Sequence, residues 1–391
     1  MYVERALTKE FESAANSNNM VVVVGPRQAG KTTFLKEQSK KSGAYYLFFD
    51  DPDVRELFDI DIKRFENQYL PTGKMAILDE VQYGKDAGRK LKYLVDSGRK
   101  LWVTSSSEIM LNKEVLSWLV GRTAIIRLYP FSLAEFLAAK GLKETTPKVV
   151  LRSIDEHMSY GGYPKVVIEN DVPGKELLLK NLCETMLLKD MAKTFQIEDI
   201  TALERFVAYL SHYVGSIMRY NNICKDLGMS FQSVKKYLDA MEKSYLIVLV
   251  QPFYSNRLKE ITKQPKLYFL DTGLRNAIAN EFKATIESRG GLFENYVLSE
   301  LIKAGKKVRY WRSKGDAEVD FVIQDGEQIV PIEVKFRMSG NTIERSMHSF
   351  IESYSPKSGF VVFYEGKRGA AKFGKCNVVF TDLPSLIAAI R

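Results

Sequence analysis

The chain has 391 residues, of which 45% are hydrophobic and 27% are charged; 57 Lys plus Arg against 48 Asp plus Glu give a formal net charge of +9. This composition is that of a globular protein with roughly two to four domains, and the basic excess favours contact with a polyanion. No apolar run approaches the roughly 18 residues of a transmembrane helix, no signal core is visible at the N-terminus, and three scattered cysteines argue against a disulfide framework or a zinc site. We therefore expect a cytoplasmic protein with no membrane partner.

The first predicted element with a chemical role is a strand followed by a glycine-bounded loop and a helix. The β-branched run Val21–Val24 predicts the strand, and residues 33–40 predict the helix. The loop between them fits GxxxxGK[ST], in which backbone N–H groups and a helix N-terminus surround phosphate oxygens. Its lysine is expected to reach the β- and γ-phosphates of ATP. The predicted ATP-binding residues are Gly25, Pro26, Arg27, Gln28, Ala29, Gly30, Lys31, Thr32 and Thr33.

The segment MAILDE at 75–80 predicts a second strand that ends in two acidic residues. Asp79 is expected to hold Mg²⁺ together with the Thr32 hydroxyl, largely through water, because Mg²⁺ keeps much of its hydration shell. Glu80 is placed to polarise the attacking water as a catalytic residue.

Three further strands are predicted at residues 44–50, 101–107 and 123–128. Helix-length segments join all five strands, which predicts an α/β parallel sheet with helices on both faces. Thr104, or its neighbour Ser105, either senses the γ-phosphate or caps the next helix. Arg122 is either a surface residue or a catalytic finger directed at a neighbour's γ-phosphate, and the second role requires a homo-oligomer.

Beyond residue 140 the pattern is helical until about residue 212, with the loop GGYP at 161–164, and predicts a lid over the nucleotide. Residues 203–262 then resemble a winged helix-turn-helix: three helices, with Gly228 at a tight turn, precede a strand pair or wing. The start of the third helix is the expected recognition segment for DNA; the alternative is a protein-interaction module. The predicted DNA contacts are Gln232, Ser233, Lys235, Lys236 and Tyr237.

The last third predicts an amphipathic helix at 292–305, with Glu294 near its start, and a hairpin formed by 308–323 and 329–336. A turn centred on Gly326-Glu327 places Asp320 directly opposite Glu333. A turn centred on Asp325-Gly326 shifts the register by two residues and keeps the same face. Lys335 shares that face because it follows Glu333 by two residues.

Two carboxylates on one face are costly unless a cation joins them or one is protonated. Mg²⁺ held by Asp320 and Glu333, with Lys335 orienting or activating water and Glu294 completing the site, would suit phosphodiester hydrolysis. The alternative is an amphipathic hairpin with a surface salt bridge. Candidate contacts to a nucleic-acid backbone or base around this site are Trp311, Arg312, Lys314 and Arg337.

Together these motifs resemble a family of archaeal and bacterial AAA+-type ATPases whose C-terminal half is a domain of unknown function with a PD-(D/E)XK, restriction-endonuclease-like core. The matching segments, in order, are GPRQAGKTT, ILDEVQ, TSSS, VGR followed by PFSLAEF, GGYP, DLGMSFQSVKKYLDAMEKS, YFLDTGL, LFENYVLSEL, EVDFVI and IEVK. The resemblance implies ATP and Mg²⁺ at Gly25, Gly30, Lys31, Thr32, Asp79 and Glu80. It also implies a nuclease-like fold around Glu294, Asp320, Glu333 and Lys335. The family often has Gly after the sensor Thr, where this chain has Ser105.

The predicted domains are a P-loop AAA+-type ATPase core at 1–140, a helical lid at 141–202, the winged helix-turn-helix at 203–262 and the restriction-endonuclease-like α/β domain at 263–391. The predicted function is ATP hydrolysis coupled to DNA binding and Mg²⁺-dependent DNA cleavage. One alternative is a nucleotide-gated switch that binds DNA or a protein partner without cleaving. Another is a motor that docks through its C-terminal half.

Overall fold

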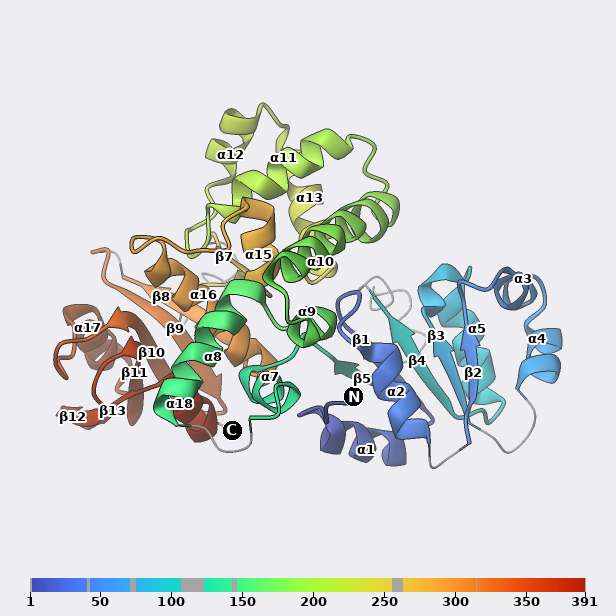
Figure 1. Cartoon of the computed structure of the whole chain (residues 1–391), viewed down its shortest axis with the longest axis horizontal. Helices are drawn as coiled ribbons and strands as arrows, with labels where there is room; N and C mark the ends of the chain where they lie inside the picture. The colour runs from blue at the N-terminus through green and yellow to red at the C-terminus, as the bar shows by residue number, and fades with distance from the viewer. Residues whose placement is uncertain are drawn as a thin grey trace.

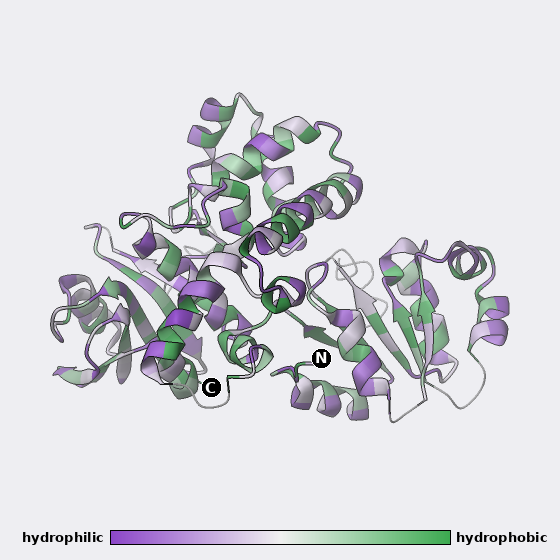
Figure 2. Cartoon of the chain, in the orientation of Figure 1, coloured by the Kyte–Doolittle hydropathy of each residue, from purple (hydrophilic) through white to green (hydrophobic). Residues whose placement is uncertain are grey.

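The computed structural model describes residues 2–40, 43–70, 75–106, 123–142, 146–254, 263–313 and 315–390. A sheet domain formed by the N-terminal part of the chain lies at one end of the molecule and a second sheet domain, formed by the C-terminal part, at the other, with a helical region joining them (Figure 1). The strands of the first sheet are largely hydrophobic, whereas the helices carry both hydrophobic and hydrophilic residues (Figure 2). Within the described residues, no helix has both the length and the apolar character needed to cross a membrane.

The described part of the N-terminal domain contains five parallel strands in the order β2-β3-β4-β1-β5, which confirms the predicted parallel sheet. The three inner strands are buried throughout, as expected for a sheet covered on both faces. Because β4 lies between β1 and β3, the end of β4 lies beside both the phosphate loop and the acidic end of β3. The strands are β1 (Met20–Val24), β2 (Tyr45–Phe48), β3 (Ala76–Asp79), β4 (Leu101–Ser105) and β5 (Thr123–Arg127). The helical elements are α1 (Thr8–Ser17), α2 (Lys31–Ser39), α3 (Pro52–Ile60), α4 (Ile62–Tyr69), η1 (Val81–Tyr83) and α5 (Ala87–Asp96).

The helical region begins after β5, and its helices start at recognisable signals. Pro occupies the first turn of α8, α9 and α10, and Ser230 caps α13 by accepting from the Ser233 N–H. The Gly228 backbone is left-handed and ends α12 before α13 begins. The elements are α7 (Leu133–Ala139), α8 (Pro147–Tyr160), α9 (Pro164–Ile168), α10 (Val172–Thr185), the π-helix η3 (Met186–Lys193), α11 (Ile200–Ser211), α12 (Tyr220–Leu227), α13 (Phe231–Lys243), β6 (Ile247–Val250), β7 (Lys266–Phe269) and α15 (Thr272–Ala279).

The expected domain boundary at residue 263 falls inside one structural unit. β6 and β7 pair antiparallel across it, from Ile247 opposite Phe269 to Val250 opposite Lys266. Leu267 and Leu274 of this segment belong to the same hydrophobic core as α10, α11 and α13. A strand's partner is not visible in its own sequence, so β7 and α15 were expected in the C-terminal domain although they complete the helical region.

The described C-terminal domain contains a six-stranded mixed sheet in the order β12-β13-β11-β10-β9-β8. The helices α16 and α18 pack on one face of this sheet, and α17 packs on the other. The elements are α16 (Arg289–Lys303), β8 (Val308–Arg312), β9 (Glu318–Asp325), β10 (Gln328–Arg337), α17 (Arg345–Tyr354), β11 (Ser358–Glu365), β12 (Gly369–Phe373), β13 (Cys376–Thr381) and α18 (Leu383–Ile390).

Helix α16 is buried more completely than the expected amphipathic helix. Apart from Glu294, every side chain from Leu292 to Leu301 is buried. The helix contacts β10 and α18 on one side and β7, α15 and α8 on the other, so protein encloses it on most of its circumference. It therefore forms the structural link between the helical region and the C-terminal sheet.

Candidate functional site

In the phosphate loop between β1 and α2, the side chain of Lys31 folds back onto the backbone of the loop. The Lys31 ammonium donates to the carbonyl oxygens of Gly25 and Pro26, each at 3.0 Å, and only 4% of Lys31 is exposed. Burial lowers the pKa of Lys31, and the nearby carboxylates of Glu80, Asp190 and Asp79 oppose this effect. The ammonium therefore lies at the loop, where the phosphate oxygens of a nucleotide would compete with the two carbonyl oxygens for its N–H groups.

Gly25 is required by the close approach of the loop to the chain after β5. Its φ is +152°, and a Cβ built on it would lie 2.0 Å from the carbonyl oxygen of Leu128. We expect Gly25→Ala to lower the free energy of unfolding by about 3 kcal/mol, measured by urea denaturation. The control is Gly290→Ala in α16, where a Cβ meets nothing within 4 Å and no positive φ occurs; equal stability of the two variants would contradict this account.

Asp79, at the end of β3, receives hydrogen bonds from three hydroxyl groups. Thr32 Oγ1 lies 2.8 Å from its Oδ2, the Tyr46 hydroxyl lies 2.5 Å from the same oxygen, and Thr104 Oγ1 lies 2.5 Å from its Oδ1. Burial and the Asp79 charge raise the pKa of Tyr46, which stays a donor. The Thr32 hydroxyl and the Asp79 carboxylate supply the hard oxygen ligands that Mg²⁺ prefers, so this pair fits the predicted ion.

Thr104 forms hydrogen bonds with both acidic residues at the end of β3, Asp79 and Glu80. Its side chain is fully buried, and its hydroxyl accepts from the Glu80 N–H at 2.9 Å while donating to Asp79. These contacts position the two acids and leave no hydroxyl proton for a γ-phosphate. The Glu80 backbone is left-handed, with φ of 57°, and its carboxylate accepts from the Gln82 amide. Gln82 and Tyr46 were not predicted, because only the three-dimensional arrangement brings them to this site.

The side chain of Arg27 points away from the phosphate loop and contacts Asp190 of the helical region. Its Nε lies 3.0 Å from Asp190 Oδ2, its Nη2 lies 2.9 Å from Asp190 Oδ1, and the same nitrogen donates to the Tyr83 hydroxyl at 2.9 Å. Burial raises the pKa of Asp190, and Arg27 opposes this effect. Asp190 lies in η3, a π-helix, and its carbonyl accepts from Ser244 Oγ at the end of α13. Asp190 therefore contacts both Arg27 of the phosphate loop and Ser244 at the end of α13.

A second link runs from the loop to the segment after β5. Arg5 donates to the carbonyl oxygens of Ala29 and Tyr129, at 3.0 and 2.5 Å, and forms an ion pair with Glu135 at 2.9 Å. Both side chains of this ion pair are nearly fully buried, so loss of one would leave an uncompensated charge. The pair holds the phosphate loop against α7.

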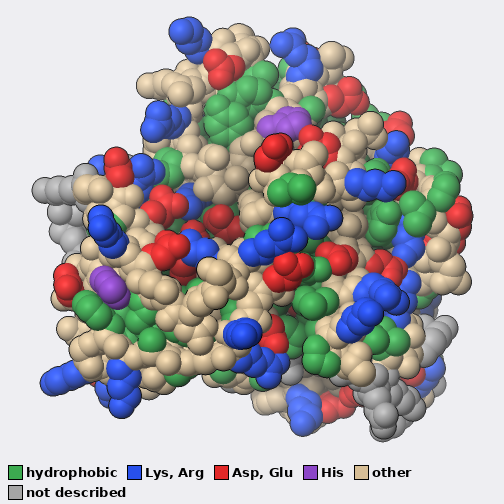
Figure 3. Space-filling model, turned by 60° about the vertical axis from the view of Figure 1, so that its left-hand side comes forward, with side chains coloured by type: hydrophobic (Ala, Val, Ile, Leu, Met, Phe, Trp, Pro, Cys, Tyr) green, Lys and Arg blue, Asp and Glu red, His purple; other side chains and the backbone are tan. Residues whose placement is uncertain are grey.

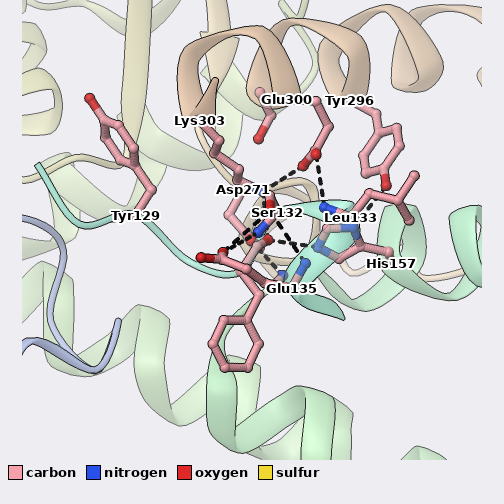
Figure 4. Close-up of polar contacts among 12 residues, drawn as sticks. Tyr129, Ser132, Leu133, Glu135, His157, Asp271, Tyr296, Glu300 and Lys303 are labelled. Atoms are coloured by element: carbon pink, nitrogen blue, oxygen red, sulfur yellow. Dashed lines mark hydrogen bonds and ion pairs between the residues drawn. The ribbon is translucent and has the colours of Figure 1, made fainter. Parts of the chain in front are cut away.

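The segment after β5 is joined in turn to α16 (Figure 4). Glu300 accepts from the Leu133 N–H at 2.8 Å, and Lys303 donates to the Phe131 carbonyl at 3.1 Å. His157 contacts the Tyr296 hydroxyl at 2.8 Å and the same carbonyl at 3.1 Å. Burial keeps the pKa of His157 well below its ordinary value, so the ring is neutral. α16 thus carries both this junction and, nearer its start, Glu294.

The β9–β10 hairpin brings the predicted acidic residues together. Its register pairs Gln328 with Asp325 and Ile332 with Phe321, which is the register of a turn centred on residues 326 and 327. Extended by one residue beyond the last bonded pair, this register would set Asp320 opposite Glu333. Asp320 Oδ2 accepts from the Val334 N–H at 2.8 Å, and Lys335 Nζ lies 3.0 Å from Glu333 Oε1.

Glu333 carries an unsatisfied buried oxygen. The residue is 5% exposed, and its Oε2 has no hydrogen-bond partner among the described residues. Burial raises the pKa of Glu333 to about 7, and burial together with Glu333 and Glu294 raises that of Asp320 well above its ordinary value. Among the described residues no three His, Cys, Asp or Glu side chains cluster closely enough to form a metal site. The fit to a divalent ion therefore rests on Asp320 and the orphaned Glu333 oxygen.

The other side of this acidic centre is built by β7, which sequence reasoning did not include. The Tyr268 hydroxyl donates to Glu294 Oε1 at 2.5 Å, and the buried Lys266 ammonium lies 3.8 Å from the same oxygen. Lys266 also forms an ion pair with Glu318 at the start of β9. A strand of alternating polar and apolar residues at 266–269 is the only sequence signal for this contribution.

The predicted DNA contacts on α13 divide into exposed and buried side chains. Gln232, Lys235 and Lys236 are exposed, Ser233 is half-buried, and Lys236 donates to the Gln196 carbonyl at 2.8 Å. Tyr237 is 7% exposed, and its ring packs edge-on against Phe206, so this residue belongs to the core and not to a contact surface.

Of the candidates around the acidic centre, Trp311 is also a core residue. It is 5% exposed and packs edge-on against Phe350, which removes it as a stacking platform. Arg312 pairs with Asp316, and Arg337 pairs with Glu365. The predicted roles of Arg122 and Lys314 fall on positions outside the described residues.

A basic cleft lies between the two sheet domains. It has a volume of about 1060 Å³ and is lined by β5, β6, the end of α16 and the start of β8. Its lining includes Arg127, Lys306, Lys307 and Arg309 against the single acidic side chain of Glu10, in addition to the buried Arg5–Glu135 pair and Lys303. On the face seen in Figure 3, by contrast, Lys and Arg lie interspersed with Asp and Glu. The cleft is therefore suited to a polyanion.

Comparison with known proteins identifies three segments of the chain. Residues 17–137 match the family described as an AAA domain, residues 151–285 match a domain of unknown function (DUF8612), and residues 289–385 match another (DUF4143). The division near residue 287 agrees with the placement of β7 and α15 in the helical region.

Similar proteins occur in bacteria and archaea. An uncharacterized protein of Haemophilus influenzae is 26% identical over 83% of this chain and 84% of its own length. One of Methanocaldococcus jannaschii is 26% identical over 88% and 81%. Among solved structures, a Walker-type ATPase of Pyrococcus abyssi is 15% identical, with a TM-score of 0.46, over 71% of this chain and 96% of that one.

The AAA match covers the parallel sheet, the phosphate loop and the Thr32–Asp79 pair. Residues 17–137 therefore form an AAA-type domain with the fold of a P-loop ATPase.

Proposed function

We propose that the protein is a Mg²⁺-dependent ATPase whose nucleotide cycle controls the binding and cleavage of DNA. The observation that carries the cleavage half is the buried, unpartnered Oε2 of Glu333 beside Asp320, with Lys335 held on the same strand face. A buried carboxylate oxygen without a partner is costly unless a ligand completes it. This distinguishes the arrangement from a surface salt bridge.

In the nucleotide site, the loop amides and Lys31 would hold the phosphates, and Thr32 and Asp79 would hold Mg²⁺. When bound, Mg²⁺ neutralises charge on the β- and γ-phosphates. Lys31 exchanges its carbonyl partners for phosphate oxygens, and Glu80, oriented through its N–H by Thr104, positions the attacking water.

In the C-terminal centre, Asp320 and Glu333 would hold a divalent ion that activates water and stabilises the charge developing on a phosphodiester. Lys335 Nζ, which also pairs with Glu344, orients the water or the scissile phosphate. Glu294 is fixed by the Tyr268 hydroxyl at the edge of this centre.

The element order of α11, α12, α13 and the β6–β7 ribbon supports a winged helix-turn-helix that holds DNA. The isolated bridge between Ile217 and Lys266 adds a third extended segment to this ribbon. Lys235 and Gln232 are exposed at the start of α13, where a recognition helix contacts a major groove. The basic cleft offers a second surface for a phosphate backbone.

The proposal is tested by measuring ATP turnover with duplex, branched and single-stranded DNA, and DNA cleavage with Mg²⁺ or Mn²⁺. We expect at least one DNA form to change the turnover rate several-fold, and metal-dependent cleavage of that form. Identical turnover in all cases would remove the coupling. Cleavage in no condition, with coupling intact, would favour the nucleotide-gated switch.

Coupling is expected to pass through Asp190, because it contacts Arg27 of the phosphate loop and Ser244 of α13. Asp190→Asn removes the charge that holds Arg27, so we expect the change in ATP turnover on adding DNA to fall to less than about a third of its wild-type value. The control is Glu184→Gln, an exposed residue of α10. A DNA response unchanged in Asp190→Asn would exclude this route.

A further inference from the structure

Lys266 is a buried lysine that the proposed cleavage chemistry does not yet use. Its side chain is 4% exposed and comes from β7, a strand of the helical region, although its ammonium lies among carboxylates of the C-terminal domain. It pairs with Glu318, lies 3.8 Å from Glu294 and sits 5.5 Å from the centroid of the Tyr310 ring. Burial lowers the pKa of Lys266, and Glu294 and Glu318 more than offset this, so the group is charged.

The charged side chains of the centre come from three strands and one helix. Its carboxylates are Glu294, Glu318, Asp320 and Glu333, and its ammonium groups are Lys266 and Lys335. The two ammonium groups contact different carboxylates: Lys335 contacts Glu333, whereas Lys266 contacts Glu318 and lies near Glu294. Glu344, Asp316 and Arg312 stand at the rim, where water screens their charges.

We propose that Lys266 is a positioning residue of the cleavage centre, a fixed positive charge that holds Glu294 and Glu318 and weakens the binding of a divalent ion beside Asp320. The inference rests on the proposed function. A divalent ion beside Asp320 would be repelled by this ammonium, which already attracts the nearby carboxylates. The β6–β7 ribbon thereby contributes directly to the centre, so residues 289–385 alone would lack part of it.

The test is titration of the nucleotide-free full-length chain with Mn²⁺, by calorimetry, with binding at this centre defined as what Asp320→Asn removes. We expect Mn²⁺ binding that depends on Asp320 in the wild type. Lys266→Met should bind Mn²⁺ at least tenfold more tightly, because a nearby repelling charge is gone, whereas Lys266→Arg should match the wild type. The matched control is Lys90→Met, which removes the lysine partner of Asp59 in the N-terminal domain.

Glu318→Gln gives a second test that does not depend on a buried lysine, since its side chain is 29% exposed. Loss of this negative charge should weaken Mn²⁺ binding at least threefold. Mn²⁺ affinity unchanged in folded Lys266→Met or in Glu318→Gln overturns the inference and leaves the metal centre standing. Absence of any Asp320-dependent Mn²⁺ in the wild type overturns the metal centre itself, and with it the inference.

Discussion

Lys31→Ala is expected to reduce ATP turnover at least about 100-fold, the effect of removing one preorganised donor from a charged transition state. The ammonium is 4% exposed and is held 3.0 Å from two loop carbonyls, where phosphate oxygens would bind it. Both kcat and nucleotide affinity should fall, since Lys31 contacts phosphate before and during transfer. Steady-state phosphate release and binding of a fluorescent ATP analogue measure the two effects.

The control for this experiment is Lys40→Ala, at the end of the same helix. Its side chain is 68% exposed and pairs only locally with Glu37, so turnover should stay within about twofold of the wild type. If Lys31→Ala bound and hydrolysed ATP like the control, the loop would not be the nucleotide site, and the functional proposal would fail at its first step.

Asp320→Asn is the second change with a large expected effect. It keeps the size of the side chain and removes the charge opposite Glu333, so metal-dependent cleavage should fall at least about 100-fold, since even residues that only orient a metal ligand cost 10–100-fold. ATP turnover without DNA should be unchanged, because Asp79 and Thr32 lie in the other sheet domain. A plasmid-nicking assay with Mn²⁺ or Mg²⁺ provides the measurement.

Asp316→Asn is the matched control, because Asp316 lies on the preceding turn, is 79% exposed and pairs with Arg312. It should cleave like the wild type. Equal cleavage by Asp316→Asn and Asp320→Asn would assign any nuclease activity to another site or to a contaminant. ATP turnover and the unfolding curve of Asp320→Asn show whether the variant is folded, and so whether a loss of cleavage is due to the missing carboxylate or to misfolding.

The local part of this protein was predictable because short segments determine it. The strand–loop–helix around Lys31 depends on consecutive residues, and the β9–β10 hairpin has the first of the two registers that its turn residues left open. Side-chain burial was less predictable: Tyr237 and Trp311 were assigned to nucleic-acid contacts and are core residues. When a large aromatic residue is next to basic residues in the sequence, the sequence does not show whether its side chain packs into the core or faces solvent.

By itself the sequence determined the parallel α/β sheet, the phosphate loop with its Thr32–Asp79 pair, and the β9–β10 hairpin that carries Asp320 and Glu333, because periodicity and short spacings specify each of them. Only the tertiary structure decided that β7 joins β6, that Lys266 and Tyr268 complete the acidic centre, and that Asp190 holds Arg27 across 163 positions of chain. These contacts join segments far apart in sequence. They form because burying a charge or a strand edge requires a partner, and the fold as a whole selects which partner is within reach.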